Sequence, residues 1–271
     1  MRRTLGGLVV SLVLAVGAHA QPGSAPKGHL VVIGGGTIPD DVRARTLALA
    51  GGTKAIVAVL PQASELPETG PEAVDAWKKA GAARAIVVDV AARAAAIEAI
   101  REATLVWFPG GDQTRLMKAL NGTGIPEVIR ERYAGGATIA GTSAGAAVMS
   151  KVMITGDGYD LQAITAKKTD TLPGLGLWPQ VIVDQHFLKR QRQNRLLSAV
   201  LDHPQLVGVG IDESTAAVVS GTQFEAIGKS SIVVIDARKA AVAPTAAGEP
   251  IAGRDIRVHV LKAGMKLDLG K

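Results

Sequence analysis

A Gly-Thr-Ser-Ala-Gly segment at residues 141–145 has the Gly-x-Ser-x-Gly spacing that can expose a serine hydroxyl for nucleophilic attack. The flanking glycines let a sharp strand-to-helix turn pack without Cβ clashes. An apolar strand is predicted before the turn and a helix after it, whose N-terminus favours developing negative charge. This context predicts Ser143 as a nucleophile, and the alternative is a packed Gly/Ser turn without chemistry.

A serine nucleophile needs a general base, which is usually a histidine. The chain has five histidines. His19 lies in a predicted leader, His29 precedes the first strand, His203 sits in a helix-end turn and His259 lies within a late strand. Only His186 directly follows a predicted strand in the region of alternating strands and helices, where open α/β sheets place their ligands. This elimination predicts His186 as the base, and the alternative is a surface or capping histidine.

The base in turn needs an acid to orient it. Asp212 and Glu213 follow another predicted strand at residues 208–211. Because side chains alternate along a strand, only one of the two carboxylates can face the site. The residues alone leave the choice open, and an exposed acidic turn is the alternative.

Acyl transfer also requires backbone N–H donors for the developing oxyanion. The N–H of Ala144, directly after the nucleophile, is one candidate. A second must come from a neighbouring loop, and the Phe-Pro-Gly-Gly-Asp-Gln segment at residues 108–113 has the glycine freedom that this role needs. The three glycines at residues 34–36 match neither a dinucleotide fingerprint nor a P-loop, so they are interpreted as tight backbone packing at the rim of a site.

Alternating strands and helices are predicted to position these residues. The predicted strands lie at residues 30–33, 55–60, 85–88, 105–108 and 138–140, and the predicted helices at residues 40–50, 71–79, 91–102, 113–120, 126–133 and from 144 onward. This pattern predicts βαβ units, a parallel sheet and right-handed crossovers in one α/β domain. Runs at residues 231–235 and 256–261 predict antiparallel strands at a sheet edge, and residues 240–253 predict a long surface loop.

The composition excludes several classes of protein. Apolar residues make up 47% of the 271 residues, enough for a sizeable core, and the absence of cysteine excludes a disulfide scaffold, an iron–sulfur cluster and a thiol nucleophile. Aromatic residues at 3% argue against a stacking platform for single-stranded nucleic acid. The histidines lack metal-ligand spacing, so neither a metal nor another cofactor is expected.

The first twenty residues have the three regions of a secretory signal peptide. A short basic start containing Arg2 and Arg3 precedes an apolar run, and Ala-His-Ala ends the segment as a cleavage site. The run is shorter than the roughly 20 apolar residues that span a bilayer. We therefore expect residues 21–271 to form a single secreted domain, periplasmic or extracellular, with no membrane segment. Its charge of +4 without the leader is spread along the chain and does not predict nucleic-acid binding.

Four motifs in this order resemble those of cyanophycinase and its relatives in the aspartyl-dipeptidase group, family S51 of the serine peptidases. They are Phe-Pro-Gly-Gly-Asp-Gln at 108–113, Gly-Thr-Ser-Ala-Gly-Ala at 141–146, Asp-Gln-His-Phe at 184–187 with three following arginines, and Asp-Glu-Ser-Thr-Ala at 212–216. The resemblance covers essentially the whole chain after the leader.

The resemblance implies a class I glutamine amidotransferase-like fold, a flavodoxin-like α/β architecture with a mostly parallel central sheet. It implies Ser143 as nucleophile, His186 as base and Glu213 as the acid of the triad. The order serine, histidine, acid agrees, since α/β-hydrolases run serine, acid, histidine. It also implies Gly111 and Ala144 as the oxyanion donors.

The resemblance further implies cleavage next to aspartyl residues. Cyanophycinases release β-Asp-Arg dipeptides from a polymer with a poly-aspartate backbone and arginine branches, so the expected partner is a peptide or polymer rich in aspartate. The expected substrate-binding residues are Asp112, Gln113, Gln185, Arg190, Arg192 and Arg195. Arg195 ranks first because it matches the last arginine of the motif and because arginine grips carboxylates bidentately.

Several alternatives stay open. Asn194 stands where family members often have glycine, which keeps a periplasmic isoaspartyl dipeptidase in consideration. A general serine esterase and a non-catalytic binding protein on the same fold are the other two. The chain could also form a homodimer.

Overall fold

The structure, a computed structural model, describes residues 25–270, so the predicted leader at residues 1–20 lies outside the described residues. The first five strands lie parallel in a large sheet in the order β1-β5-β4-β2-β3. Their bounds are β1 (Leu30–Ile33), β2 (Ile56–Val59), β3 (Arg84–Val87), β4 (Leu105–Phe108) and β5 (Thr138–Thr142). Every strand predicted in this part of the chain is therefore present, within two residues at each end.

Three antiparallel strands extend this sheet beyond β1 in the order β10-β11-β16. They are β10 (Thr215–Ser220), β11 (Gln223–Gly228) and β16 (Lys266–Asp268). The sheet therefore has eight strands, with the parallel β1 hydrogen-bonded on one side to the parallel β5 and on the other to the antiparallel β10.

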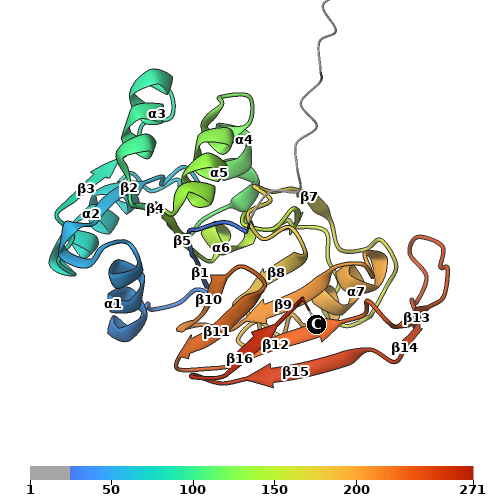
Figure 1. The fold of residues 1–271 in the computed structure, drawn as a ribbon. Helices are drawn as coiled ribbons and strands as arrows, with labels where there is room; N and C mark the ends of the chain where they lie inside the picture. Colours follow the sequence, from blue (N-terminus) through green and yellow to red (C-terminus); the bar gives the residue numbers. More distant parts are fainter. Residues whose placement is uncertain (1–24, 271) are drawn as a thin grey trace, which may run out of the picture.

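A second sheet of four strands has the order β15-β12-β9-β8 (Figure 1). Its members are β8 (Val181–Gln185), β9 (Val207–Ile211), β12 (Ile232–Asp236) and β15 (Arg257–Leu261). β8 and β9 are parallel, and β12 and β15 are antiparallel to their neighbours. The chain passes from the second sheet to the first in the short turn between β9 and β10, because β10 pairs with β1. The sequence does not predict this division into two sheets.

The helices cover both faces of the large sheet and one face of the small one (Figure 1). They are α1 (Asp40–Leu49), the 3-10 turn Gly52–Lys54, α2 (Thr69–Lys79), α3 (Arg93–Glu102), α4 (Gln113–Leu120), α5 (Ile125–Gly135), α6 (Ala144–Ala147) and α7 (Gln193–Asp202). Two short hairpins complete the fold, β6 (Val152–Ile154) with β7 (Thr171–Pro173) and β13 (Ala241–Val242) with β14 (Gly253–Arg254). The predicted surface loop at residues 240–253 is thus the hairpin of β13 and β14.

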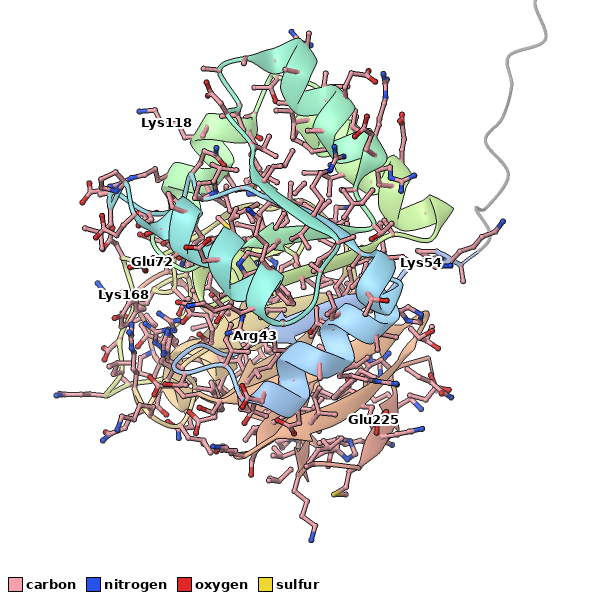
Figure 2. All side chains as sticks on the ribbon, turned by 90° about the vertical axis from the view of Figure 1, so that its left-hand side faces the viewer. Arg43, Lys54, Glu72, Lys118, Lys168 and Glu225 are labelled. Atoms are coloured by element: carbon pink, nitrogen blue, oxygen red, sulfur yellow. The ribbon has the colours of Figure 1, made fainter. Side chains whose placement is uncertain are left out.

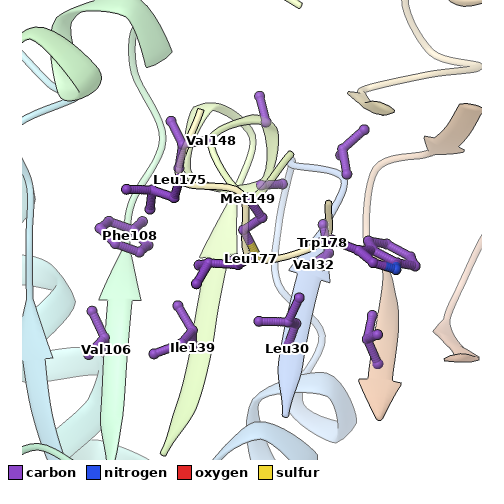
Figure 3. Packing of buried hydrophobic residues seen from close by; sticks show 14 of the residues in the cluster. Leu30, Val32, Val106, Phe108, Ile139, Val148, Met149, Leu175, Leu177 and Trp178 are labelled. Atoms are coloured by element: carbon purple, nitrogen blue, oxygen red, sulfur yellow. The ribbon is translucent and has the colours of Figure 1, made fainter. Parts of the chain in front are cut away.

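The core follows from the alternation of side chains along the buried strands. Leu30 and Val32 of β1 point to the layer that contains α3 to α6, and Val31 and Ile33 point to the layer of α1 and α2. Figure 3 shows the first layer, in which Phe108 and Met149 lie over the ends of the strands. Burying both faces removes each of these side chains from water, which is worth roughly 1.5–3 kcal/mol per residue.

Most charged side chains lie at the surface, where Figure 2 labels Lys54, Glu72, Lys118 and Lys168. Exposed ion pairs such as Arg101 with Glu98 add little stability, about 0–1 kcal/mol each. Within residues 25–270, no helix has the length and hydropathy needed to cross a membrane.

Candidate active site

Ser143 sits in the sharp turn between β5 and α6, with an unusual backbone conformation at φ +54° and ψ −114°. Two glycines make this turn possible. A Cβ on Gly141 would overlap the backbone of Gly145, and a Cβ on Gly145 would overlap the backbone of Phe108. The backbone N–H of Ser143 donates to the carbonyl of Ile33 at 3.0 Å, which fixes the turn to the end of β1. Strain of this kind costs about 1–3 kcal/mol and persists because the surrounding contacts determine it.

His186 lies directly after β8, and its imidazole Nε2 is 2.9 Å from the hydroxyl oxygen of Ser143. Its backbone also has a positive φ, of +49°, and its N–H donates to the carbonyl of Gly34 at 2.6 Å. The residue is buried, at 7% exposed. The structure therefore brings the predicted nucleophile and the predicted base within hydrogen-bond distance.

Glu213 occupies the turn after β9 and completes the chain of hydrogen bonds. Its Oε1 is 2.7 Å from Nδ1 of His186. Asp212, the other candidate left open by the residues, faces away from the ring and accepts the backbone N–H groups of Leu188 and Lys189. The Ser–His–Glu arrangement places Nδ1–H toward the carboxylate and leaves Nε2 free to accept a proton from the serine.

The glycine turn at residues 34–36 packs against both His186 and Glu213. Gly35, at φ +113°, lies so close to the His186 ring that an added Cβ would stand 2.5 Å from Nε2. Gly36, at φ +67°, lies against Glu213 in the same way, with an added Cβ 3.0 Å from its Oε2. The interpretation of this segment as tight backbone packing at the rim of a site is confirmed. Its glycines are required because the imidazole and the carboxylate occupy the space of any side chain.

The protonation state of His186 is set mainly by burial. Desolvation lowers the pKa of His186 below its ordinary value of 6.5, and the cations of Arg190 and Arg192 lower it further. The hydrogen bond and the negative charge of Glu213 oppose this shift. Because the net direction is downward, the imidazole is neutral at neutral pH and can act as a base.

The Phe-Pro-Gly-Gly loop after β4 lies against the serine. A Cβ on Gly110 would stand 3.5 Å from the Cβ of Ser143. Gly111 has φ +140°, and a side chain there would overlap the carbonyl of Ala63. The loop that carries the predicted donor Gly111 is thus adjacent to Ser143, and Ala144 begins α6 on its other side. This is the neighbourhood in which an oxyanion would form.

The expected substrate-binding arginines are largely inside the protein. Arg195 is 1% exposed, its guanidinium donates to both carboxylate oxygens of Asp184, and Nε lies 2.8 Å from Oδ2. Arg192 is 5% exposed and donates to the carbonyl and side-chain oxygens of Gln185 at 2.7 and 2.9 Å. Burial, followed by repulsion from Arg195, lowers the pKa of Arg192.

This placement corrects the expectation that Arg195 is the leading substrate grip. Helix α7 begins at Gln193 and not directly after the histidine, so Arg195 falls in its first turn and points inward to Asp184. The aromatic ring of Tyr159 covers its outer side, 4.6 Å from the guanidinium carbon. Neither Asp184 nor Tyr159 was a candidate site residue, since the motif spacing does not show which way each side chain points.

The remaining expected substrate residues differ in how much freedom they have. Asp112 caps α4 by accepting the N–H groups of Thr114 and Arg115, and Gln113 is buried with its amide donated to the carbonyl of Ile154. Arg190 is exposed and close enough to His186 to affect its charge. Arg190 is therefore the candidate cation that a substrate can reach beside the histidine. Among residues 25–270, no cluster of three or more His, Asp or Glu could hold a metal ion.

Comparisons with known proteins identify the family of this chain. The sequence profile of Peptidase family S51 matches residues 30–227. A cyanophycinase from Nostoc sp. is 37% identical over 261 residues, which cover 90% of this chain and 87% of that protein. A cyanophycinase from Geminocystis herdmanii is 38% identical over 254 residues, covering 88% of this chain and 92% of that protein.

A solved structure has the same fold. The crystal structure of a peptidase from an acI-B1 Actinobacterium aligns with a TM-score of 0.63 at 20% identity, over 91% of this chain and 98% of that one. The family match and the cyanophycinase relatives indicate a hydrolase, a serine-type peptidase. The chain belongs to peptidase family S51.

Proposed function

We propose that this serine peptidase cleaves aspartyl peptide bonds through Ser143, His186 and Glu213. The observation that carries the proposal is the continuous chain of hydrogen bonds from Ser143 Oγ to His186 Nε2 at 2.9 Å and from His186 Nδ1 to Glu213 Oε1 at 2.7 Å. This chain has the geometry of a nucleophile, a base and an orienting acid.

The reaction has two halves, each assisted by the same imidazole. Ser143 Oγ attacks the scissile carbonyl carbon while its proton passes to His186 Nε2, and the resulting imidazolium is stabilised by Glu213. The oxyanion accepts the N–H groups of Gly111 and Ala144. His186 then gives the proton to the leaving amine, and the acyl-enzyme forms. Water, deprotonated by the same nitrogen, then attacks the acyl carbon. The bond from this carbon to Ser143 Oγ breaks, His186 returns the proton to Oγ, and the acid product leaves.

The proposed substrate carries aspartyl residues and, in the cyanophycinase-like case, β-Asp-Arg units. Two relatives at 37% and 38% identity are cyanophycinases, which supports this choice over a general esterase. Arg190, exposed beside His186, is the proposed contact for a substrate carboxylate, because a guanidinium can bind both oxygens. We propose that the other five expected residues hold the segments around the site through the contacts described above; they are Asp112, Gln113, Gln185, Arg192 and Arg195.

We also propose that the protein works outside the cytoplasm. The support is the basic start, apolar run and Ala-His-Ala site of residues 1–20. Cell fractionation followed by N-terminal sequencing tests this, and the expected mature chain begins at Gln21. A protein retained in the cytoplasm with Met1 in place would contradict it.

The deciding experiment incubates residues 21–271 with cyanophycin and with a panel of β-aspartyl and α-aspartyl dipeptides, and identifies the products by mass. Release of β-Asp-Arg from the polymer is the expected result, and Ser143→Ala should abolish it while leaving the fold intact. Cleavage of the dipeptides alone would assign an isoaspartyl or aspartyl dipeptidase. A folded Ser143→Ala protein that retains more than a tenth of the activity would reject the triad.

A further inference from the structure

The base and the acid of the proposed triad stand on two separate turns. His186 follows β8 and Glu213 follows β9, and both turns contain a residue in the left-handed region, His186 itself and Ser214 at φ +55°. Groups on loops are held less precisely than groups on helices and strands unless a surrounding shell supports them. The 2.7 Å bond between His186 and Glu213 therefore depends on contacts that hold one turn against the other.

Asp212 makes those contacts. Its Oδ1 accepts the backbone N–H of Leu188 at 3.1 Å and of Lys189 at 2.9 Å, which are the second and third residues after the histidine. Its Oδ2 accepts the hydroxyl of Ser230 at 2.7 Å, from the segment that leads into β12. One carboxylate thus bonds the histidine turn, the glutamate turn and the neighbouring strand.

The backbone of the same turn adds to this connection. The N–H of Asp212 donates to the carbonyl of Ser231 at 3.3 Å, and the N–H of Ser214 donates to the carbonyl of Gly35 at 2.9 Å. These two bonds fix the glutamate turn to β12 and to the glycine turn. Of the carboxylates beside the triad, only that of Asp212 is shown bonding to the backbone after His186 within residues 25–270.

We propose that Asp212 is a positioning residue, which holds the His186 turn and the Glu213 turn at the separation that proton transfer requires. The proposal rests on the proposed triad and goes beyond it, because Asp212 acts through the other two residues and bonds to the backbone beside the histidine rather than to its ring. It also explains why an acidic pair follows β9, with one carboxylate for the imidazole and the other for the turn.

The charge of Asp212 suits this role. Burial by itself would raise the pKa of Asp212, but the N–H groups of Lys189, Glu213 and Leu188 and the Ser230 hydroxyl together lower it. The side chain is therefore ionised at neutral pH. An ionised carboxylate accepts several hydrogen bonds at once, and such charge-assisted bonds are shorter and stronger than neutral ones.

The test compares two substitutions at this position. Asp212→Ala removes every side-chain contact of this residue. We expect kcat to fall about 100-fold, because a displacement of the reacting groups by about 1 Å costs a factor of about 100. We expect KM to change less than about threefold, because Asp212 does not bind the substrate. Asp212→Asn keeps an oxygen for the two N–H groups and an amide that can donate to Ser230, so we expect a loss below about 10-fold.

Asp236→Ala is the matched control. Asp236 is also a carboxylate with a lowered pKa, and it accepts the backbone N–H and the guanidinium of Arg238. Asp236 is the last residue of β12 and pairs with Val207, at the end of the second sheet that lies away from the site. At the other end of β12, Ile232 pairs with Ile211, which directly precedes Asp212. We expect this variant to keep the kcat of the wild type even where its thermal stability falls.

Two further measurements separate positioning from general weakening. The rate at which a fluorophosphonate labels Ser143 reports nucleophile activation without a substrate, and the low-field proton resonance of His186 Nδ1–H reports its bond to Glu213. Asp212→Ala should slow labelling and broaden or shift the resonance, while Asp236→Ala should change neither. If Asp212→Ala does not fold, Asp212→Ser, whose hydroxyl cannot serve all three partners, replaces it with the same expectations.

A folded Asp212→Ala or Asp212→Ser protein with the kcat and labelling rate of the wild type would overturn the proposal. So would an equal loss in Asp236→Ala, because the effect would then be general destabilisation. These outcomes differ from failure of the triad itself, which would appear as a fully active Ser143→Ala protein.

Discussion

Replacement of Gly35 by alanine would test how closely the backbone holds the imidazole of His186, the proposed base. Gly35 lies against the ring of His186, and an alanine Cβ would stand 2.3 Å from its Cε1 and 2.5 Å from its Nε2. Ordinary contacts of this kind begin near 3.4 Å. The ring must therefore move by about 1.1 Å, because the glycine turn is fixed by the bonds of Gly34 and Gly35 to both neighbouring turns.

This movement would break the hydrogen bond between His186 and Ser143. The distance from His186 Nε2 to Ser143 Oγ is 2.9 Å, so a ring displacement of about 1.1 Å is large enough to take the two atoms beyond hydrogen-bond range. We expect kcat to fall about 100-fold, or roughly 2.7 kcal/mol in the activation barrier, with KM nearly unchanged. The left-handed backbone of Gly35 adds about 1–2 kcal/mol of lost stability.

Gly51→Ala separates these two effects. Gly51 has φ +102°, similar to the +113° of Gly35, and an added Cβ there meets nothing within 4 Å. Thermal unfolding and steady-state hydrolysis of the substrate that the wild type cleaves are measured for both variants. Both should lose stability, and only Gly35→Ala should lose activity. Unchanged kcat in Gly35→Ala, or an equal loss in Gly51→Ala, would refute the argument from the ring contact.

Three other predictions concern charge at the site. Glu213→Gln should reduce kcat by about 10³–10⁴ without unfolding the protein, since an amide cannot stabilise the His186 imidazolium, and steady-state kinetics with circular dichroism checks both. Arg190→Gln removes a cation that lowers the pKa of His186, so the acidic limb of the pH–kcat/KM profile should move toward higher pH, and a limb that stays or moves the other way contradicts this. Activity appears as pH rises through the depressed pKa of His186, because only the neutral imidazole is a base. High salt should move the acidic limb of the wild type part of the way toward higher pH, because it screens the charge of Arg190. Arg195→Met leaves the buried carboxylate of Asp184 without its main partner and should lower the free energy of unfolding by about 3 kcal/mol in a denaturation curve. Equal losses of activity on an aspartyl peptide and on an uncharged ester would indicate a structural role. Loss of activity on the peptide alone would indicate that Arg195 binds the substrate.

Much of the first half of the fold could be predicted from the sequence. The strands around Val32 and Val106 are short apolar runs closed by Gly or Pro, and the helices between them have helical spacing and clear stop signals. These are local properties, which depend on residues near one another in the chain. The turn of Ser143 is predicted in the same local way, from the spacing of Gly141 and Gly145 around the serine. The structure shows the reason, since a Cβ on either glycine would overlap neighbouring backbone.

The division into two sheets could not be predicted in this way. β8 and β9 are apolar strands like the earlier ones, yet they pair with each other and β9 pairs with β12, while neither pairs with β1. Pairing of this kind joins residues distant in the chain, such as Val209 and Val234, and depends on which edges are free when the strands meet. No pattern within one strand records that choice.

Side-chain direction in the turns is the other feature that only the tertiary structure decided. The sequence indicates that an acid after β9 serves His186, but it does not distinguish Asp212 from Glu213. The motifs likewise predict Arg192 and Arg195 as substrate-binding residues, whereas the structure buries both side chains. Strand alternation ends at the last residue of a strand, and helical spacing begins only where the helix does. Between them the direction of each side chain is set by backbone angles such as the positive φ of His186, and those angles are imposed by contacts with other segments of the chain.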